Sequence, residues 1–216
     1  MISQSIKSKT RPQYGQGTNR NAEGANTISE DTIQAMAITA EMRDPYTAGH
    51  QRRVTHLATT IAAEMGLAED RISGLRLAGL VHDIGKTRVP VEILTNPLKL
   101  SGAEFSIIRT HPTVGYDILQ TIEFLHPIAK IVYQHHERLD GSGYPNGVTG
   151  NDIMLEAKIL AVADVVEAMS SHRPYRPAIG LDKALLEISE RKDILYDIEA
   201  VEVCLVICRQ KKFRFE

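Results

Sequence analysis

Residues 72–86 read ISGLRLAGLVHDIGK, a stretch that combines an apolar helical face with a polar group at its end. The apolar face comprises Ile72, Leu75, Ala78 and Gly79, which recur at the spacing of one side of an α-helix. His82 falls on the same face, so we expect its imidazole to point into the core. Gly85 is predicted to end this helix, with Pro90 beyond it.

Helical patterns continue on both sides of this stretch. Upstream, an apolar stripe is followed by Gly66, which is typical of a helix C-terminal cap. Two capping-box signatures, Thr27 with Glu30 and Ser101 with Glu104, indicate helix starts. Helices are predicted from near 27, near 45, around 72 and from 101, and over about 112–121, 127–135, 152–169, 181–191 and 197–210. Strand patterns are missing, so we predict an all-α fold.

The first 26 residues have a different composition. They are rich in Ser, Asn, Gln, Gly and Thr and show almost no apolar periodicity. Such a segment has too little apolar surface to fold alone. We therefore predict residues 1–26 to be a flexible tail, either a disordered leader or a linker remnant, with a docking arm as the alternative. Residues 27–216 are predicted to form one helical domain.

Composition and charge exclude several classes of protein. Hydrophobic residues make up 43% of the 216 and charged residues 24%, as in ordinary water-soluble domains. No run approaches the roughly 18 apolar residues of a membrane-spanning helix. The 25 basic and 27 acidic residues nearly cancel, so no broad field would gather a nucleic-acid polymer. The start shows no signal-peptide pattern, and Cys204 and Cys208 are expected to be buried free thiols, so we predict a cytoplasmic location.

Histidine and aspartate are the side chains that indicate chemistry. The candidates are His50, His82, Asp83, His111, His135, His136 and Asp164. A lone histidine on an apolar face is usually a core residue bonded to a carbonyl, but this many polar groups in a bundle core would be costly without a metal. Imidazole and carboxylate ligands favour iron, manganese or zinc, and the lack of a cysteine cluster argues against a structural zinc site. His56, His126 and His172 are not expected to be ligands.

Five separate motifs identify a family resemblance. They are RDPYTAGHQRRV (43–54), HDIGK (82–86), HPTVG (111–115), HHERLDGSGYP (135–145) and ADVVEAMSSHRPYR (163–176). In this order, over roughly residues 30–190, they resemble the HD-GYP family of cyclic di-GMP phosphodiesterases. The resemblance implies an all-α HD-superfamily helical bundle with a metal centre of two or three cations. It also implies hydrolysis of cyclic di-GMP to linear pGpG, or further to GMP.

The resemblance also implies a ligand set. It assigns His50, His82, Asp83 and Asp164 to one metal, and His111, His135 and His136 to the second, with Asp83 bridging the two. Some family members hold a third metal through a glutamate one helical turn before the first histidine, but here that position is Tyr46. We therefore expect two divalent transition-metal ions, iron or manganese, with zinc, nickel or cobalt as alternatives, and pGpG as the main product. Two cations about 3.5–4 Å apart could share a hydroxide that attacks the phosphorus in line.

Substrate contacts are predicted around this centre. Lys86 follows Asp83 by one turn and is expected to neutralise a non-bridging phosphate oxygen, so these two residues form the predicted catalytic pair. Loop 137–151 is rich in glycine; Gly143 would let the backbone approach a phosphate, and Tyr144 would stack on a guanine base. The other predicted contacts are Arg173, Arg176 and Glu167. At the position of Glu167 the family often has an aspartate.

Two other functions stay open from the sequence. One is an HD-type phosphohydrolase that acts on another cyclic dinucleotide or a nucleotide, since the metals bind phosphate rather than base. The other is a non-catalytic cyclic di-GMP-binding or interaction module, which the presence of every predicted ligand and of Lys86 disfavours. The expected partners are a cyclic dinucleotide substrate and either a second copy of the chain or a regulatory or sensor protein.

Overall fold

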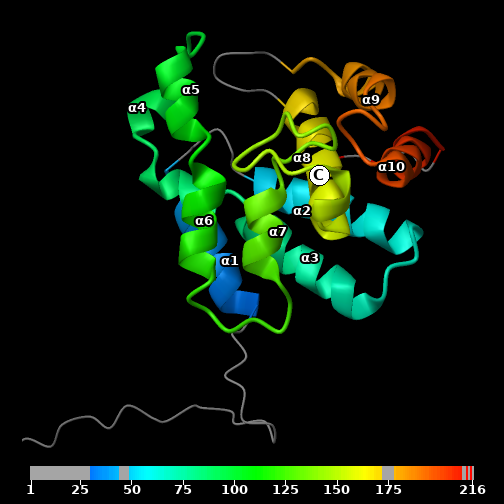
Figure 1. The fold of residues 1–216 in the computed structure, drawn as a ribbon, viewed down its shortest axis with the longest axis horizontal. Coiled ribbons are helices and arrows are strands. Elements are labelled where there is room, and N and C mark those ends of the chain that lie inside the picture. The colour runs from blue at the N-terminus through cyan, green and yellow to red at the C-terminus, as the bar shows by residue number, and fades with distance from the viewer. Residues whose placement is uncertain (1–29, 44–48, 172–177, 211–212, 214, 216) are drawn as a thin grey trace, which may run out of the picture.

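The computed structural model describes residues 30–43, 49–171, 178–210, 213 and 215. Over these residues the chain is helical, and the one β-type pairing is an isolated bridge between Lys192 and Tyr196 (Figure 1). This confirms the all-α prediction. The predicted tail, residues 1–26, and the capping box that begins at Thr27 lie outside the described residues.

The helices follow the predicted order. Their bounds are α1 (Glu30–Glu41), α2 (His50–Glu64), α3 (Glu69–Val81), the 3-10 turn η2 (Ile84–Arg88), α4 (Val91–Leu94), α5 (Gly102–Ile108), α6 (His111–Leu119), α7 (Ile128–Gln134), the 3-10 turn η3 (Gly150–Asp152), α8 (Leu155–Ser170), α9 (Leu181–Glu190) and α10 (Ile198–Gln210). No helix within the described part of the chain is long and apolar enough to cross a membrane.

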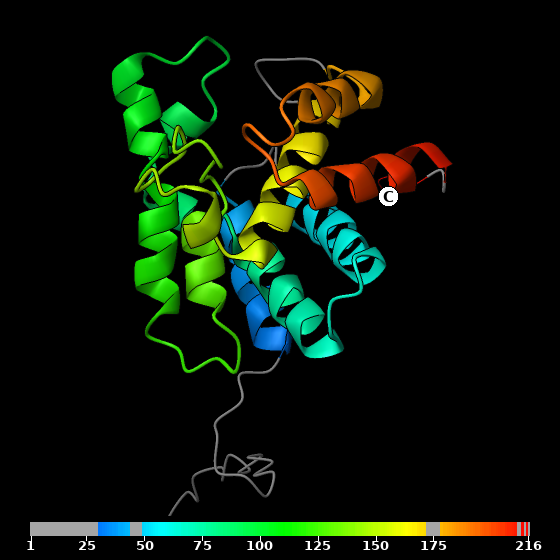
Figure 2. The ribbon, with the colours of Figure 1, turned by 45° about the vertical axis from the view of Figure 1, so that its right-hand side comes forward.

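The centre of the bundle is formed by α2, α3 and α8. Helix α2 packs along both of the others, α3 also contacts α1 and α7, and α8 contacts α9 and α10 (Figures 1 and 2). One continuous cluster of buried apolar side chains runs from Ile33 in α1 to Cys208 in α10. Cys204 and Cys208 are buried free thiols, as the sequence predicted.

Two of the predicted helix ends are confirmed by their hydrogen bonds. After α2, Gly66 adopts a left-handed backbone conformation with a φ of 75°, and its N–H donates to the Ala63 carbonyl. At the start of α5, the Ser101 hydroxyl accepts from the Glu104 N–H, and the Glu104 carboxylate accepts from the Ser101 N–H. The sequence signals were specific here because each requires only local contacts.

The predicted end of α3 near Gly85 is wrong, since the helix stops at Val81 and the 3-10 turn η2 begins at Ile84. Gly85 does not act as a left-handed cap. Its missing side chain instead allows close packing, because a Cβ atom there would lie 1.9 Å from the His111 carbonyl oxygen. This contact holds η2 against the start of α6 and so brings Asp83 close to His111.

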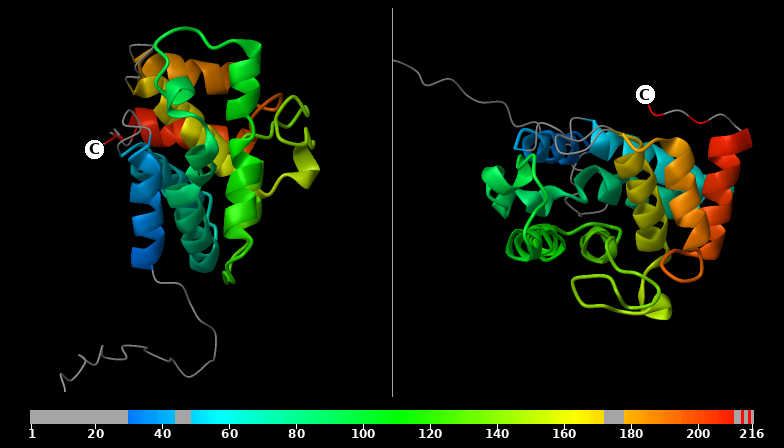
Figure 3. Two further views of the ribbon diagram at one scale, coloured as in Figure 1. Left: turned by 90° about the vertical axis from the view of Figure 1, so that its left-hand side faces the viewer. Right: turned by 90° about the horizontal axis from the view of Figure 1, so that it is seen from above.

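The helix ends converge on one place. His50 begins α2, His82 follows α3, His111 begins α6 and His135 follows α7, while Asp164 lies within α8. The loop between α7 and α8, residues 135–154, stands on the outer side of the bundle beside this point (Figure 3). Side chains at helix ends are well placed for a shared site, because the helical backbone behind them already has its hydrogen bonds.

Candidate metal centre

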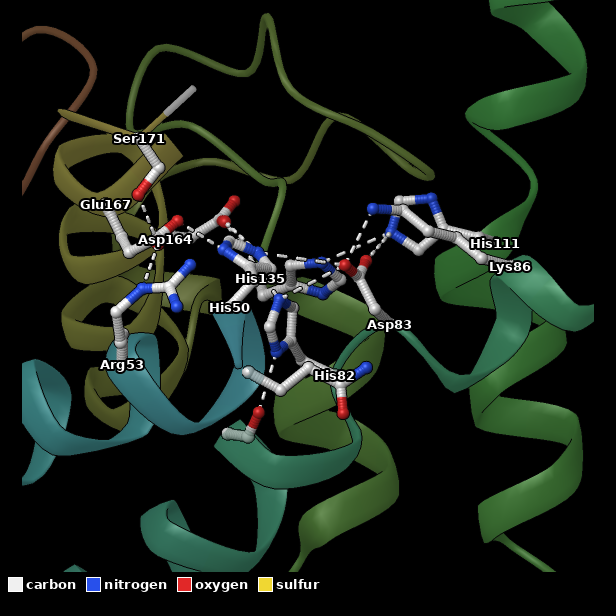
Figure 4. A network of polar contacts seen from close by, with 12 residues as sticks. His50, Arg53, His82, Asp83, Lys86, His111, His135, Asp164, Glu167 and Ser171 are labelled. Atoms are coloured by element: carbon white, nitrogen blue, oxygen red, sulfur yellow. Dashed lines mark hydrogen bonds and ion pairs between the residues drawn. The ribbon is translucent and has the colours of Figure 1, made fainter. Parts of the chain in front are cut away.

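The predicted ligands gather in two groups of three, and a third group, His82, Asp83 and His135, links them. The first contains His50, His82 and Asp164, and the second contains His111, His135 and His136. Within each group the ligand atoms all lie within 4.8 Å of one another. The two groups match the two ligand sets that the resemblance implied, apart from Asp83, and Figure 4 shows most of these side chains pointing toward a common centre.

Asp83 lies between the two groups. Its Oδ2 atom is 3.8 Å from His50 Nε2 and 3.6 Å from His82 Nε2, both in the first group. Its Oδ1 atom is 3.5 Å from His111 Nε2, in the second group. One carboxylate therefore presents an oxygen to each ligand set, which is the arrangement that a bridging ligand requires.

Three of the histidines are oriented by backbone carbonyls. In His82, His111 and His135 the Nδ1–H donates to the carbonyl three residues earlier in the chain. The acceptors are Gly79 (2.7 Å), Ile108 (2.8 Å) and Val132 (2.5 Å). Because Nδ1 carries the proton, the Nε2 lone pair faces the centre, as in metal-binding histidines.

The polar atoms of the centre fit a cation. His82 Nε2 is buried and has no hydrogen-bond partner within the described residues. Burial lowers the pKa of His111 to about 4 and that of His135 to about 3, so both imidazoles are neutral near pH 7. Burial alone would raise the pKa of Asp83, but Lys86 and the surrounding histidines hold it well below its usual value. The neutral imidazoles of His111 and His135 and the ionised carboxylate of Asp83 are in the protonation states that metal binding needs. For His50, burial favours the neutral form, but hydrogen bonds with Asp164 and Glu167 raise the pKa to about 8.

Glu167 lies beside the first ligand group and contacts His50. Its side chain is 0% exposed, and one oxygen accepts a hydrogen bond from His50 Nδ1. The other oxygen accepts from Arg53 Nε and from Ser171 Oγ, each at 2.7 Å. Burial opposes ionisation, yet these bonds lower the pKa of Glu167 to about 2. Both oxygens accept hydrogen bonds from protein side chains, and one of them orients the His50 imidazole (Figure 4). The substrate contact of Glu167 stays a prediction.

This geometry predicts that Glu167→Gln weakens metal binding. The amide lacks the charge that stabilises the His50 N–H donor, and its NH₂ group would face either His50 or Arg53. Loss of such an outer partner lowers metal affinity by about 10–100-fold, measurable by competition with a chelator. Ser171→Ala is the matched control, since it removes one partner of Glu167 but leaves the contact with His50. Unchanged metal affinity together with a raised KM for cyclic di-GMP would instead support the predicted substrate contact of Glu167.

Lys86 faces the same centre from the 3-10 turn η2. Its Nζ atom donates to Asp83 Oδ2 at 2.6 Å, and its side chain is only 16% exposed (Figure 4). The 3-10 turn explains this contact, because residues three apart, such as Asp83 and Lys86, lie on the same side of a 3-10 helix. The structure therefore brings the predicted catalytic pair into direct contact.

The glycine-rich loop packs closely against itself at Gly143. A Cβ atom at Gly143 would lie 2.4 Å from the Arg138 backbone nitrogen and 2.5 Å from Glu137 Cα. Internal packing therefore requires glycine at this position, and the predicted approach of a phosphate to Gly143 stays a prediction. Asn146 N–H donates to a Glu137 carboxylate oxygen at 2.8 Å and closes the loop further.

Tyr144 covers the second ligand group. Its ring centroid lies 4.7 Å from that of His136, and the guanidinium carbon of Arg109 lies 4.7 Å from the same ring. The predicted stacking on a guanine base stays a prediction, since these two neighbours already occupy part of the ring surface. Tyr46, Arg173, Arg176 and His172 lie outside the described residues.

Two residues of this region were missed by the sequence analysis. Arg53 lies one helical turn after His50, so its position on the same face of α2 was a usable signal. Arg109 lies two residues before His111, but its contact with Tyr144 depends on the folded loop. His56 is not part of the centre, as predicted, and stacks on Phe213 with ring centroids 5.0 Å apart.

Comparison with known families decides the classification. A family model described as HD domain matches residues 34–200. The chain belongs to the HD-domain family. This HD domain is 38% identical over 177 residues to the "Cyclic di-GMP phosphodiesterase response regulator RpfG" of Xanthomonas campestris, covering 81% of the chain and 47% of that relative. It is 39% identical over 177 residues to the "Cyclic di-GMP phosphodiesterase" of Thermotoga maritima, covering 81% and 48%. The HD domain thus spans about half the length of these curated relatives.

Solved structures confirm the fold of the HD domain. The cyclic GMP-AMP-specific phosphodiesterase V-cGAP3 of V. cholerae superposes with a TM-score of 0.64 at 18% identity, over 84% of this chain and 49% of that one. The HD domain of the L. monocytogenes phosphodiesterase PgpH, in complex with cyclic-di-AMP, gives 0.60 at 19% identity, over 88% and 100%. The all-α HD-superfamily bundle implied by the motifs is confirmed, and so is the resemblance itself.

Proposed function

We propose that this HD domain is a metal-dependent phosphodiesterase that hydrolyses cyclic di-GMP to linear pGpG. The observation that carries the proposal is the pair of ligand groups that share Asp83, with Lys86 in contact with the same carboxylate. Two relatives with 38% and 39% identity bear the name cyclic di-GMP phosphodiesterase, which supports this choice of substrate.

Two divalent cations fit the donor set, with iron or manganese favoured and zinc, nickel or cobalt as alternatives. Imidazole nitrogens and carboxylate oxygens suit these ions, and the buried, unpartnered His82 Nε2 would gain a partner. When bound, the cations would offset the charge of the phosphodiester and lower the pKa of a water that serves as nucleophile. With position 46 a tyrosine, we propose two ions rather than three.

The side chains of the domain supply the remaining requirements. Asp83 stays ionised and holds the two ligand groups in a fixed relation. Lys86 carries a positive charge at the same point, where it can donate to a non-bridging oxygen that gains charge in the transition state. Glu167 fixes the orientation of His50, and Tyr144 covers His136 from the loop side.

A second substrate is favoured by a specific observation. Three relatives from Vibrio cholerae bear the name 3'3'-cGAMP-specific phosphodiesterase, with identities of 39%, 39% and 34%. The same ligand groups would serve either compound, because they face a phosphate and not a base. Cyclic GMP-AMP is therefore the second candidate substrate.

One experiment tests the proposed function. Protein purified without oxygen is incubated with cyclic di-GMP, the products are separated by chromatography, and metals are counted on the same sample. We expect two metals per chain and pGpG that accumulates with little GMP. Conversion of 3'3'-cGAMP alone would favour the second candidate, and no turnover of either compound by metal-loaded protein would overturn the proposal.

Regulation and location are part of the same proposal. Because the HD domain matches less than half of relatives such as the response regulator, we propose that it works under the control of a further sensor segment or a separate regulatory protein, or as a homodimer. We propose a cytoplasmic location, where Cys204 and Cys208 would stay reduced.

A further inference from the structure

Arg109 is a positively charged side chain beside the metal centre that has no role in the proposed reaction. It follows α5 directly and lies two residues before His111, a member of the second ligand group. Its side chain is exposed, and its guanidinium carbon sits 4.7 Å from the centroid of the Tyr144 ring. Tyr144 in turn contacts His136. Arg109 is therefore held one side chain outward from the ligands.

Other arginines near the centre have partners that explain them. Arg53 pairs with the buried Glu167 carboxylate. Arg138 donates to the Glu137 carbonyl at 2.9 Å and lies over the Tyr196 ring. By contrast, no carboxylate among the described residues forms an ion pair with Arg109. Its contact with Tyr144 is of the cation–π type, since the guanidinium carbon lies over the ring, 4.7 Å from the centroid.

This placement fits the shape of a cyclic dinucleotide. Such a substrate contains two phosphodiester groups in one ring, so when one lies between the ligand groups the other must lie a short distance away. Lys86 faces Asp83 and is placed for the phosphate being cleaved. A permanently charged planar guanidinium that lies over an aromatic ring suits the second phosphate because it can donate two parallel hydrogen bonds.

We propose that Arg109 binds the second phosphate of the cyclic dinucleotide, the one that is not being cleaved. The inference rests on the proposed phosphodiesterase function. Tyr144 is then a positioning residue for Arg109 rather than a stacking platform for a base. Arg109 contributes to substrate binding and not to metal binding or to the chemical step.

The test compares substrates with two phosphates and with one. Arg109→Ala and Arg109→Lys are assayed with cyclic di-GMP, with cyclic di-AMP and with bis(p-nitrophenyl) phosphate, which has a single phosphodiester. Loss of a charge-assisted contact predicts a KM for either cyclic dinucleotide raised about 10-fold or more in Arg109→Ala, with kcat changed less. Lysine restores part of this loss because it keeps the charge. Hydrolysis of bis(p-nitrophenyl) phosphate and metal content stay within about twofold of the unmodified protein.

Arg76→Ala is the matched control, since Arg76 is exposed on α3. An equal loss with bis(p-nitrophenyl) phosphate, or a loss of metal, would overturn the proposal by showing a structural role. A loss confined to the guanine substrate would overturn it in favour of base recognition. An unchanged KM would also overturn it.

The proposed function can fail separately in the same experiment. If the unmodified protein cleaves bis(p-nitrophenyl) phosphate but no cyclic dinucleotide, the assignment of a cyclic dinucleotide as the substrate is wrong. The role of Arg109 is then measured by competition, with cyclic di-GMP as the inhibitor of bis(p-nitrophenyl) phosphate hydrolysis. A weaker inhibition constant in Arg109→Ala supports the contact, and an equal constant or no inhibition at all overturns it.

Discussion

Asp83→Ala should lose its metals and its hydrolysis of cyclic di-GMP together. The carboxylate places one oxygen 3.6 Å from His82 Nε2, in the first ligand group, and the other 3.5 Å from His111 Nε2, in the second. Among the described residues, no other carboxylate forms ion pairs with histidines of both groups. Removing the Asp83 carboxylate leaves two incomplete sets of imidazoles and takes away the negative charge that balances the cations. We expect turnover at background level and metal content well below that of the unmodified protein.

The fold should survive this change, which keeps the prediction specific. Asp83 lies in the short connection between α3 and η2, whereas the core consists of apolar side chains on the helices behind it. Far-UV circular dichroism should therefore stay close to that of the unmodified protein. Asp117→Ala, at an exposed position of α6, is the control for a lost aspartate. Normal turnover in Asp83→Ala would end the two-metal interpretation.

The helices of this domain were largely readable from local sequence signals. The Ser101 capping box and the Gly66 cap appear as predicted because each depends on residues within one or two turns. The seven predicted ligand residues could also be selected from the sequence, because so many histidines and aspartates in a bundle core would be costly without a metal, and the structure brings all seven together. What local signals could not supply was the end of α3, because the contact between Gly85 and the His111 carbonyl is tertiary.

The residues that support the ligands were harder to predict. Glu167 and His50 are 117 residues apart in the sequence, and only the packing of α2 against α8 brings them together. A glutamate at that position reads equally well as a surface residue, a substrate contact or an orienting group. At Gly143, likewise, the sequence could not show that a Cβ atom would meet the backbone of Glu137 and Arg138 in the folded loop. Sequence motifs identify which residues matter more readily than what each one touches.

Lys86→Ala should separate chemistry from metal binding. Its ammonium group lies 2.6 Å from Asp83 Oδ2, close to where a phosphate held between the two ligand groups would gain charge. Removal of one preorganised charge partner from a transition state typically lowers kcat by about 100-fold or more. Because Lys86 is not a ligand, we expect the metal content to stay unchanged, and the deficit should fall on kcat more than on KM.

The same variant distinguishes the two roles that the contact with Asp83 allows. One possible role follows from the effect of Lys86 on Asp83, since Lys86 lowers the pKa of that carboxylate. In this role Lys86 would keep Asp83 ionised and would not contact the substrate. In that case Lys86→Ala would lose metal at neutral pH and recover it as the pH rises, since a higher pH ionises the carboxylate without help. If Lys86 acts on the substrate, metal content stays constant and raising the pH does not restore kcat. Lys99→Ala, at an exposed position after α4, controls for the loss of one positive charge. Recovery of turnover together with metal at high pH would therefore assign Lys86 to the ligand set rather than to the reaction.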